Sequence, residues 1–316
     1  MTMQQRGVRR VAVIGTGTIG ASWTANFLAR GLTVRATDPA PDAEQRLRQF
    51  VDACWPALAR LADLPPAPPH DALTFCADPE SAVAWVDFVQ EQAPEREEIK
   101  QPLLARIDAV LPPEIVIASS SSGLLISRLQ SACQHPERCV VGHPFNPPHL
   151  IPLVEVVGGE RTAPEAIEQA MAFYAAIGKR PIHIRREVPG HIANRLQAAL
   201  WREAVHLVAS GVASVADVDA AISEGPGLRW ALMGPHLTFH LAGGTGGMPH
   251  FLNQLGPPLE SWWSDLGAPR LTQEVGNALI NGVADEAGGR SIVDLATARD
   301  AFLVDLLALK NRQRGD

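Results

Sequence analysis

Lysine is almost absent from this 316-residue chain, which carries only Lys100, Lys179 and Lys310 among its 27 basic residues. The bias accompanies 26 prolines and abundant alanine, and it is typical of GC-rich coding sequence rather than of one function. Acidic residues outnumber basic ones, and the net charge is −7. A chain with this balance lacks the basic surface that binds nucleic acid non-specifically, so we expect no nucleic-acid partner.

Long apolar runs are also missing. No segment approaches the roughly 18 consecutive apolar residues that a membrane-spanning helix needs. The N-terminal residues MTMQQRGVRR contain no apolar core of a secretion signal. We therefore expect a cytoplasmic protein that does not contact a membrane.

Cysteine is scarce and scattered. Cys54, Cys76, Cys133 and Cys139 form no CxxC pair and no Cys/His spacing of the kind that binds zinc. We expect them to be reduced thiols, and we predict no metal site. The remaining composition, 46% apolar and 19% charged, is ordinary for a globular enzyme. The length is sufficient for two domains or for one large domain.

The N-terminal segment predicts a βαβ unit. Val8–Gly15 is a short β-branched run that ends in glycine, as buried parallel strands often do. Thr18–Gly31 places apolar residues at helical spacing, and Leu32–Asp38 is a second strand-like run. Such a unit spans about thirty residues, and its helix crosses over with a right-handed sense.

The same alternation of strands and helices continues to about residue 188. Helices are expected at 42–62, 97–110 and 164–177. Further strands are expected at Leu73–Cys76, Val86–Val89, Ile115–Ser119, Cys139–Val141, Leu153–Val157 and Ile182–Ile184. This alternation predicts an α/β fold with a Rossmann-type doubly wound parallel sheet that helices cover on both faces.

Beyond Glu187–Leu196 the pattern becomes helical. Ser214 and Asp217 predict a capping box at the start of one helix, and no strand pattern returns before the C-terminus. We therefore expect two domains, a sheet domain over residues 1–188 and an all-helical C-terminal domain over residues 189–316.

The motif GTGTIG lies where the first expected strand meets the first helix. Its first glycine suits a tight turn, its second lets backbone approach a pyrophosphate, and its third packs helix against strand. Asp38 follows at the end of the next strand, where a carboxylate accepts ribose hydroxyls and repels a 2′-phosphate. The pattern predicts NAD as the cofactor, the alternative being a glycine turn without a ligand. The cofactor-binding candidates are Gly15, Thr16, Gly17, Thr18, Ile19, Gly20, Asp38 and Glu91.

The stretch GHPFNPPHLIPLVEVV puts His143 before a proline-rich turn and Glu155 inside an apolar run. Neighbouring strands would bring the imidazole and the carboxylate together. The carboxylate would then fix the tautomer, and the second ring nitrogen would take a proton from an alcohol. The run Ser119–Gly123 ends an earlier strand at the same edge of the sheet. The alternatives are a hydrogen-bonded structural histidine and an edge-strand carboxylate.

These motifs together resemble one family. GTGTIG, Asp38, SSSSG, GHPFNP, LVEVV and PGHIANRL occur in the order and approximate spacing of the 3-hydroxyacyl-CoA dehydrogenase superfamily, over nearly the whole chain. The resemblance implies NAD-dependent oxidation of a 3-hydroxyl group and a helical domain that forms a homodimer. It implies a site formed by Ser122, His143, Glu155 and Asn194. The chain departs from the family pattern at Gly123, where a second serine is usual, and at Ser120, where asparagine is common.

The resemblance also bears on the substrate. Members that act on acyl-CoA usually carry a lysine-rich helical insertion after the second strand, whereas Asp42–His70 contains no lysine. Gly225–Met248 is similar to the carnitine dehydrogenase branch, which implies oxidation of L-carnitine to 3-dehydrocarnitine. The alternatives are L-gulonate, a 3-hydroxyacyl-CoA, and a catalytically silent NAD-binding protein.

A quaternary ammonium group cannot donate a hydrogen bond, so aromatic faces hold it best. Trp230 is the preferred candidate because it lies in the branch-like segment, although core or interface packing is the alternative for any tryptophan. Arg195 or Arg229 is the candidate partner of the substrate carboxylate.

Overall fold

The computed structural model describes residues 7–314, and the chain divides into two compact units. The first unit runs to Arg195 and also includes Asp300–Ala308. The second unit contains Leu196–Arg299 and the residues after Ala308. The domain boundary expected between residues 188 and 189 stays a prediction.

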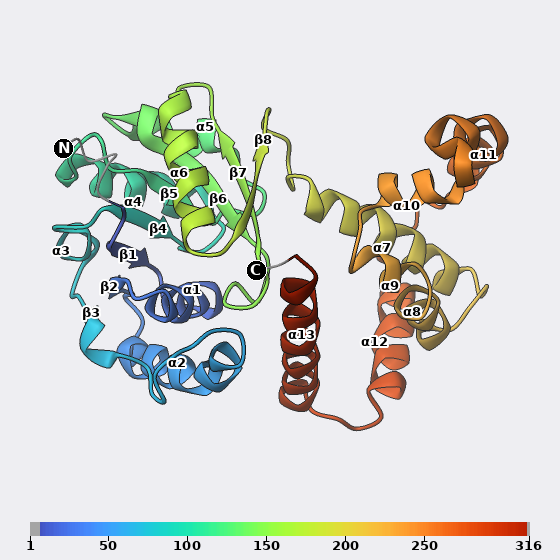
Figure 1. Ribbon diagram of the computed structural model, residues 1–316, viewed down its shortest axis with the longest axis horizontal. Helices are drawn as coiled ribbons and strands as arrows, with labels where there is room; N and C mark the ends of the chain where they lie inside the picture. The colour runs from blue at the N-terminus through green and yellow to red at the C-terminus, as the bar shows by residue number, and fades with distance from the viewer. Residues whose placement is uncertain (1–6, 315–316) are drawn as a thin grey trace. The chain divides into compact units, whose positions relative to one another are not determined.

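The first unit is built on an eight-stranded sheet in the order β3-β2-β1-β4-β5-β6-β7-β8 (Figure 1). Strands β1 to β6 are parallel, β7 is antiparallel to β6, and β8 is parallel to β7. The strands are β1 (Arg10–Ile14), β2 (Thr33–Thr37), β3 (Leu73–Phe75), β4 (Phe88–Glu91), β5 (Ile117–Ser119), β6 (Cys139–Pro144), β7 (Leu153–Gly158) and β8 (Arg180–Ile184). The expected mainly parallel, Rossmann-type sheet is confirmed.

Helices cover both faces of this sheet. Val11 and Val13 of β1 pack in one core with residues of α1, α2 and α6, whereas Ala12 and Ile14 pack in a second core with residues of α3, α4 and α5. Successive side chains of a strand point to opposite faces, so a strand buried on both sides is apolar throughout. The helices are α1 (Thr18–Ala29), α2 (Ala43–Ala59), α3 (Pro79–Val83), α4 (Glu97–Val110), α5 (Ile126–Leu129) and α6 (Pro164–Ala176), with short 3-10 turns at η2 (His70–Ala72), η3 (Gln130–Ala132) and η4 (Pro136–Arg138).

The observed strand limits differ from the expected ones by one to three residues, with the largest difference at the end of β6. β4 begins at Phe88 rather than Val86, and β6 continues to Pro144 rather than ending at Val141. The extension of β6 follows from its antiparallel pairing with β7, which runs from Val140 opposite Gly158 to Pro144 opposite Val154. The hydrogen bonds of this ladder carry the strand beyond its apolar run, and they place His143 within the sheet.

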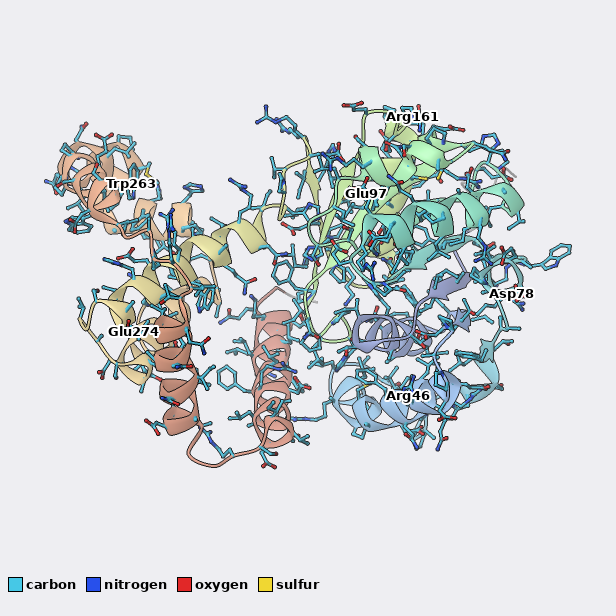
Figure 2. All side chains as sticks on the ribbon, turned by 180° about the vertical axis from the view of Figure 1, so that it is seen from behind. Arg46, Asp78, Glu97, Arg161, Trp263 and Glu274 are labelled. Carbon is cyan, nitrogen blue, oxygen red and sulfur yellow. The ribbon has the colours of Figure 1, made fainter. Side chains whose placement is uncertain are left out.

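The second unit contains no strand among its described residues. Ser214 Oγ accepts a hydrogen bond from the Asp217 N–H at 3.1 Å, which confirms the predicted capping box. Many large apolar side chains of this unit are exposed, including Trp263, which Figure 2 labels. Its helices are most of α7 (Ala193–Ala209), then α8 (Val215–Ser223), α9 (Pro226–Trp230), α10 (Pro235–Ala242), α11 (Gly247–Asp265) and α12 (Gln273–Ala287), with a 3-10 turn η5 (Gly244–Gly246) and part of α13 (Ile292–Arg314).

A buried lysine supports the turn that follows β6. Lys179 Nζ donates to the carbonyls of Pro148 and Ile151, the latter at 3.2 Å, and lies 5.1 Å from the ring centroid of Trp23. Burial, and then the nearby charge of Arg30, lower the pKa of Lys179 from 10.5 to about 7. The folded protein therefore holds this amine largely neutral at pH values where an unfolded chain keeps it protonated.

This difference in proton binding predicts a pH-dependent stability. Between about pH 7 and pH 10.5 the unfolded state binds the extra proton, so the unfolding free energy rises with pH in that window. One proton corresponds to about 1.4 kcal/mol per pH unit. Lys179→Met should remove this contribution. The unfolding free energy of the variant should therefore rise less with pH than that of the unsubstituted chain. Urea unfolding at several pH values measures the difference, and parallel stability curves would contradict the neutral lysine.

Candidate active site

The turn between β1 and α1 has backbone geometry that requires its glycines. Gly15 has a φ of +95°, and a Cβ there would lie 2.9 Å from the Gln92 carbonyl oxygen. A Cβ on Gly20 would lie 1.9 Å from the Gly15 carbonyl oxygen, whereas a Cβ on Gly17 would meet nothing within 4 Å. The first and third glycines therefore allow the turn and the helix packing. The space at the second is what a pyrophosphate needs for close approach to the backbone.

The start of α1 is also suited to an anion. Gly17 is the N-cap residue, no side chain caps the helix, and its first turn carries no acidic residue. The N–H groups of a helix N-terminus then remain available to phosphate oxygens. Thr16 is buried, Thr18 is exposed, and Ile19 packs against the core. These residues fit the phosphates of a dinucleotide.

Asp38 is tied to this turn. One carboxylate oxygen accepts a hydrogen bond from the Thr16 N–H at 2.7 Å, and the other accepts from the Ala40 N–H at 2.9 Å. The carboxylate thus follows β2 directly and lies beside the glycine turn, where the sequence pattern places the ribose. Its contact with the ribose hydroxyls stays a prediction.

Cofactor preference should depend on the charge of Asp38. Asp38→Asn keeps an oxygen that can accept from the Thr16 N–H but removes the repulsion of a 2′-phosphate. We expect the ratio of kcat/KM with NAD to kcat/KM with NADP to fall by about tenfold or more, since hydrogen bonds to charged groups carry about 1.5–3 kcal/mol. Steady-state kinetics with both cofactors measures the ratio. An unsubstituted enzyme that uses both cofactors equally would contradict the role of Asp38.

Glu91 has a different set of partners from those expected. Its side chain is fully buried, and its two carboxylate oxygens lie 2.8 and 3.1 Å from Lys100 Nζ. It also accepts from Ser119 Oγ at 2.6 Å and from the Ala93 N–H at 2.5 Å. Contact of Glu91 with the cofactor stays a prediction; in the structure its carboxylate joins the ends of β4 and β5, and Lys100 compensates its buried charge.

Glu95 is a residue that sequence reasoning missed. Its Oε1 accepts hydrogen bonds from the N–H groups of Ser122 and Gly123 at 2.9 Å and from Ser121 Oγ at 2.7 Å. Burial raises the pKa of Glu95, but the hydrogen bonds from Ser121 and Gly123 and the charge of Lys100 outweigh it, so the pKa is lowered. The ionised carboxylate thereby holds the serine-rich loop after β5. An acidic residue shortly after a strand end was the available signal.

His143 and Glu155 face each other across the antiparallel pair of β6 and β7. His143 Nδ1 lies 3.0 Å from Glu155 Oε2, and both side chains are buried. Because Nδ1 faces the carboxylate, Nε2 is the nitrogen left for a substrate. The prediction that neighbouring strands bring this imidazole and this carboxylate together is confirmed.

Glu155 is also held from the other side. Its Oε1 accepts hydrogen bonds from the N–H groups of Ile192 and Ala193, each at 2.9 Å. Burial raises the pKa of Glu155, but the hydrogen bonds from His143, Ala193 and Ile192 together lower it below its ordinary value. The carboxylate is therefore ionised at neutral pH and can stabilise an imidazolium.

The remaining expected site residues lie on segments joined to this pair. Ser122 is exposed in the loop after β5, and the preceding Ser121 carbonyl lies 3.0 Å from His191 Nε2. Asn194 is half-buried and directly follows Ala193, which donates to Glu155. The structure thus brings the loop after β5 and the start of α7 close to the His143–Glu155 pair. The contacts of Ser122 and Asn194 with a substrate stay predictions.

The expected substrate-recognition residues are exposed. Arg195 lies at the end of the first unit, and its guanidinium donates to the Pro189 carbonyl at 3.4 Å. Arg229 and Trp230 lie on α9 of the second unit. Their contacts with a substrate remain predictions. Within residues 7–314, no three His, Cys, Asp or Glu side chains form a group that could hold a metal ion, and no helix is long and apolar enough to cross a membrane.

Comparison with known proteins matches both parts of the chain. Residues 10–188 match the 3-hydroxyacyl-CoA dehydrogenase, NAD binding domain, and residues 190–288 match the 3-hydroxyacyl-CoA dehydrogenase, C-terminal domain. The L-carnitine dehydrogenase of Streptomyces coelicolor is 56% identical over 305 residues, which is 96% of each chain. That of Pseudomonas aeruginosa is 51% identical over 300 residues, 95% of this chain and 93% of the relative.

Solved structures agree with this assignment. The structure of 5-formyl-3-hydroxy-2-methylpyridine 4-carboxylic acid 5-dehydrogenase, an NAD+ dependent dismutase, superposes with a TM-score of 0.81 at 30% identity. The match covers 98% of this chain and 99% of that one. The glycine turn and the family match together assign NAD as the cofactor. The chain therefore belongs to the 3-hydroxyacyl-CoA dehydrogenase family and is an NAD-dependent 3-hydroxy acid dehydrogenase.

Proposed function

We propose that the chain oxidises the 3-hydroxyl group of L-carnitine to give 3-dehydrocarnitine. The observation that supports this chemistry is the buried His143–Glu155 pair on β6 and β7. These strands belong to the same sheet as β1, which leads into the glycine turn. The assignment of the substrate rests on the similarity to L-carnitine dehydrogenases, which are 50–56% identical over nearly the full chain.

The proposed mechanism assigns one task to each side chain. His143 Nε2 takes the hydroxyl proton while Glu155 holds Nδ1–H and stabilises the imidazolium. NAD, held at the glycine turn of Gly15–Gly20, would supply the acceptor for the hydride that leaves C3. The Ser122 hydroxyl and the Asn194 amide donate hydrogen bonds to the reacting oxygen as it becomes a carbonyl, so they orient it and stabilise its charge.

The surroundings of α2 favour a small substrate over acyl-CoA. Arg46, labelled on α2 in Figure 2, donates to the Pro41 carbonyl at 2.6 Å. Arg48 is paired with Glu44 at 2.7 Å. These guanidinium groups are engaged in local contacts, and no lysine lies in this region to meet the phosphates of CoA.

A direct comparison of substrates tests the proposal. We would measure kcat/KM with NAD for L-carnitine, L-gulonate and 3-hydroxybutyryl-CoA by following NADH absorbance. L-carnitine should give the highest value. Faster turnover of gulonate or of the CoA ester would overturn the substrate while keeping the chemistry. No NADH formation with any of them would favour a silent NAD-binding protein.

Trp230 is proposed to hold the trimethylammonium group through its ring face. Because the ammonium is remote from C3, Trp230→Ala should raise KM for carnitine by roughly 2- to 30-fold, the range of a cation–π contact of about 0.5–2 kcal/mol. The value of kcat should change much less, since this contact is equal in ground and transition states. Arg195 or Arg229 would pair with the substrate carboxylate.

Trp263→Ala is the matched control, because Trp263 is another exposed tryptophan of the same unit. It should leave KM unchanged. Choline and γ-butyrobetaine carry the trimethylammonium without the oxidisable hydroxyl, so they should compete with carnitine. Equal effects of the two substitutions, or no competition by these compounds, would remove Trp230 from the site.

We also propose that residues 189–316 form a helical substrate and dimerisation domain, and that the protein is a cytoplasmic homodimer. Exposed apolar side chains in the second unit support this assembly, because large apolar surfaces mark interaction sites. On α7 these are Leu196, Leu200 and Trp201. The four cysteines are free thiols, as in proteins of a reducing compartment. Light scattering after size-exclusion chromatography measures the mass of the assembly, which should be twice the 33.9 kDa of one chain. The mass of a single chain would contradict the homodimer.

A further inference from the structure

Two cysteines of the first unit are in direct contact. Cys133 directly follows η3, and Cys139 is the first residue of β6. Cys139 Sγ donates a hydrogen bond to Cys133 Sγ at 3.9 Å. Cys139 is fully buried, whereas Cys133 is 7% exposed and lies between the exposed residues Ala132 and Gln134. The pair thus combines a sulfur at the protein surface with one that the protein covers.

Hydrogen bonds on both sides hold this pair in place. The Cys133 N–H donates to the Gln130 carbonyl at 3.1 Å, and Gln130 Nε2 donates to the Pro136 carbonyl at 2.6 Å. The Cys139 carbonyl accepts from Thr162 Oγ1 at 2.7 Å. The short turn between the two cysteines is therefore fixed. A reaction between the two sulfurs is favoured, because groups held within reach of each other react as one molecule.

The two thiols ionise differently. The hydrogen bond from Cys139 lowers the pKa of the Cys133 thiol below its ordinary value. The charges of Arg138 and Arg161 act in the same direction, whereas burial and the charge of Asp108 oppose them. The same hydrogen bond, and then burial, raise the pKa of Cys139 well above its ordinary value. Because the thiolate is the nucleophile, Cys133 is the sulfur that reacts first, and Cys139 keeps its proton.

We propose that Cys133 and Cys139 form a reversible oxidation site for peroxides, in which Cys133 is oxidised and Cys139 then closes a disulfide. The Cys133 thiolate attacks one peroxide oxygen, and the O–O bond breaks. Cys133 becomes a sulfenic acid, and the released hydroxide takes up the proton that Cys133 had lost. Cys139 Sγ then attacks Cys133 Sγ, and the S–O bond breaks. The hydroxyl group leaves with the Cys139 proton as water, so the two sulfurs lose the two electrons that the peroxide gains.

A partner thiol makes this oxidation recoverable. A sulfenic acid without such a thiol is oxidised further to sulfinic acid, which is irreversible for most proteins. Disulfides in a reducing compartment are usually transient and redox-sensing, which agrees with thiols that are free in the resting protein. The inference does not rest on the identity of the substrate, so a failure of carnitine as a substrate leaves its test unchanged.

Peptide mapping of the full chain tests the proposal directly. The protein is treated with hydrogen peroxide, its remaining thiols are blocked, and it is digested with trypsin without reduction. Trypsin cleaves after Arg138, so Cys133 and Cys139 lie in different peptides, 129–138 and 139–161. We expect these two peptides to be cross-linked and to separate after treatment with dithiothreitol. No cross-link, or a cross-link to another cysteine, would overturn the inference.

Two substitutions test the order of the steps. In Cys139→Ser the sulfenic acid at Cys133 should persist long enough to be trapped by dimedone. Longer treatment should give a sulfinic acid that dithiothreitol does not reduce. In Cys133→Ser the buried thiol of Cys139 should stay unoxidised at the same dose of peroxide. Oxidation of Cys139 in that variant, or loss of the sulfenic acid to a disulfide in Cys139→Ser, would contradict the assigned order.

Cys54→Ser is the matched control. Burial raises the pKa of the Cys54 thiol to about 12, so this thiol stays protonated and should not react. The yield of the cross-link should equal that of the unsubstituted chain, and a lower yield would show that Cys54 takes part. Thermal unfolding of each variant is measured first. A variant that does not fold leaves the peptide map of the unsubstituted chain as the deciding result.

Discussion

His143→Ala is expected to lower kcat by about 10²–10⁴-fold, the usual contribution of a positioned general base. The reason is that His143 is the imidazole paired with Glu155 at the edge of the sheet, with Nε2 left for the substrate hydroxyl. Stopped-flow or steady-state NADH absorbance with saturating substrate measures the loss. His183→Ala is the matched control, because His183 is an exposed histidine on β8 of the same sheet and should leave kcat unchanged.

Binding of the cofactor should survive the loss of His143. The dinucleotide turn is formed by Gly15–Gly20 between β1 and α1, and its geometry does not depend on the imidazole. Isothermal titration of NAD should therefore give similar affinities for His143→Ala and the unsubstituted enzyme. Near-normal turnover of His143→Ala would show that another group is the base. A large loss of NAD affinity would show that the substitution disturbs the fold.

Glu155→Gln should lower kcat by about 10²–10⁴-fold, because it should change which ring nitrogen of His143 carries the hydrogen. The carboxylate accepts from His143 Nδ1 on one oxygen and from the Ile192 and Ala193 N–H groups on the other. The glutamine oxygen can satisfy the two backbone donors, so its amide N–H₂ then faces Nδ1. That arrangement makes Nδ1 an acceptor and puts the hydrogen on Nε2, where it blocks proton uptake. In a serine-protease triad the equivalent change costs about 10⁴-fold.

The pH–rate profile distinguishes this explanation from simple loss of packing. Removing the carboxylate charge destabilises protonated His143, so the acid limb should move to lower pH as the rate falls. Glu160→Gln is the control, because Glu160 is exposed just after β7 and should change neither quantity. A Glu155→Gln enzyme with an unchanged profile and full activity would mean that the carboxylate is only structural.

Local patterns in the sequence predicted most of the sheet. The β-branched runs and their helical connections are short-range features, so their spacing alone predicted the doubly wound fold and the helix at Glu97–Val110. The C-terminal limit of β6, by contrast, was not predicted from the sequence. Its last residues, Gly142 to Pro144, are held in the strand by pairing with β7, and the length of an apolar run does not report such pairing.

Side-chain partners were less predictable than strand positions. Glu91 is the last residue of β4 and Glu95 follows it four residues later, yet Glu91 is fully buried against Lys100 and Glu95 holds the loop at Ser122. Composition and periodicity do not distinguish two such carboxylates. Their roles depend on the path of the chain after β4 and on the position of α4.

The sequence by itself determined the glycine turn, the acidic residue after β2 and the presence of a histidine and a glutamate on adjoining strands, because each depends on residue type and short spacing. Only the tertiary structure decided that Ile192 and Ala193 donate to Glu155 and that His191 lies beside His143. These contacts join segments more than thirty residues apart in sequence. They depend on how β7, β8 and the start of α7 pack together, and no local pattern in the sequence records that packing.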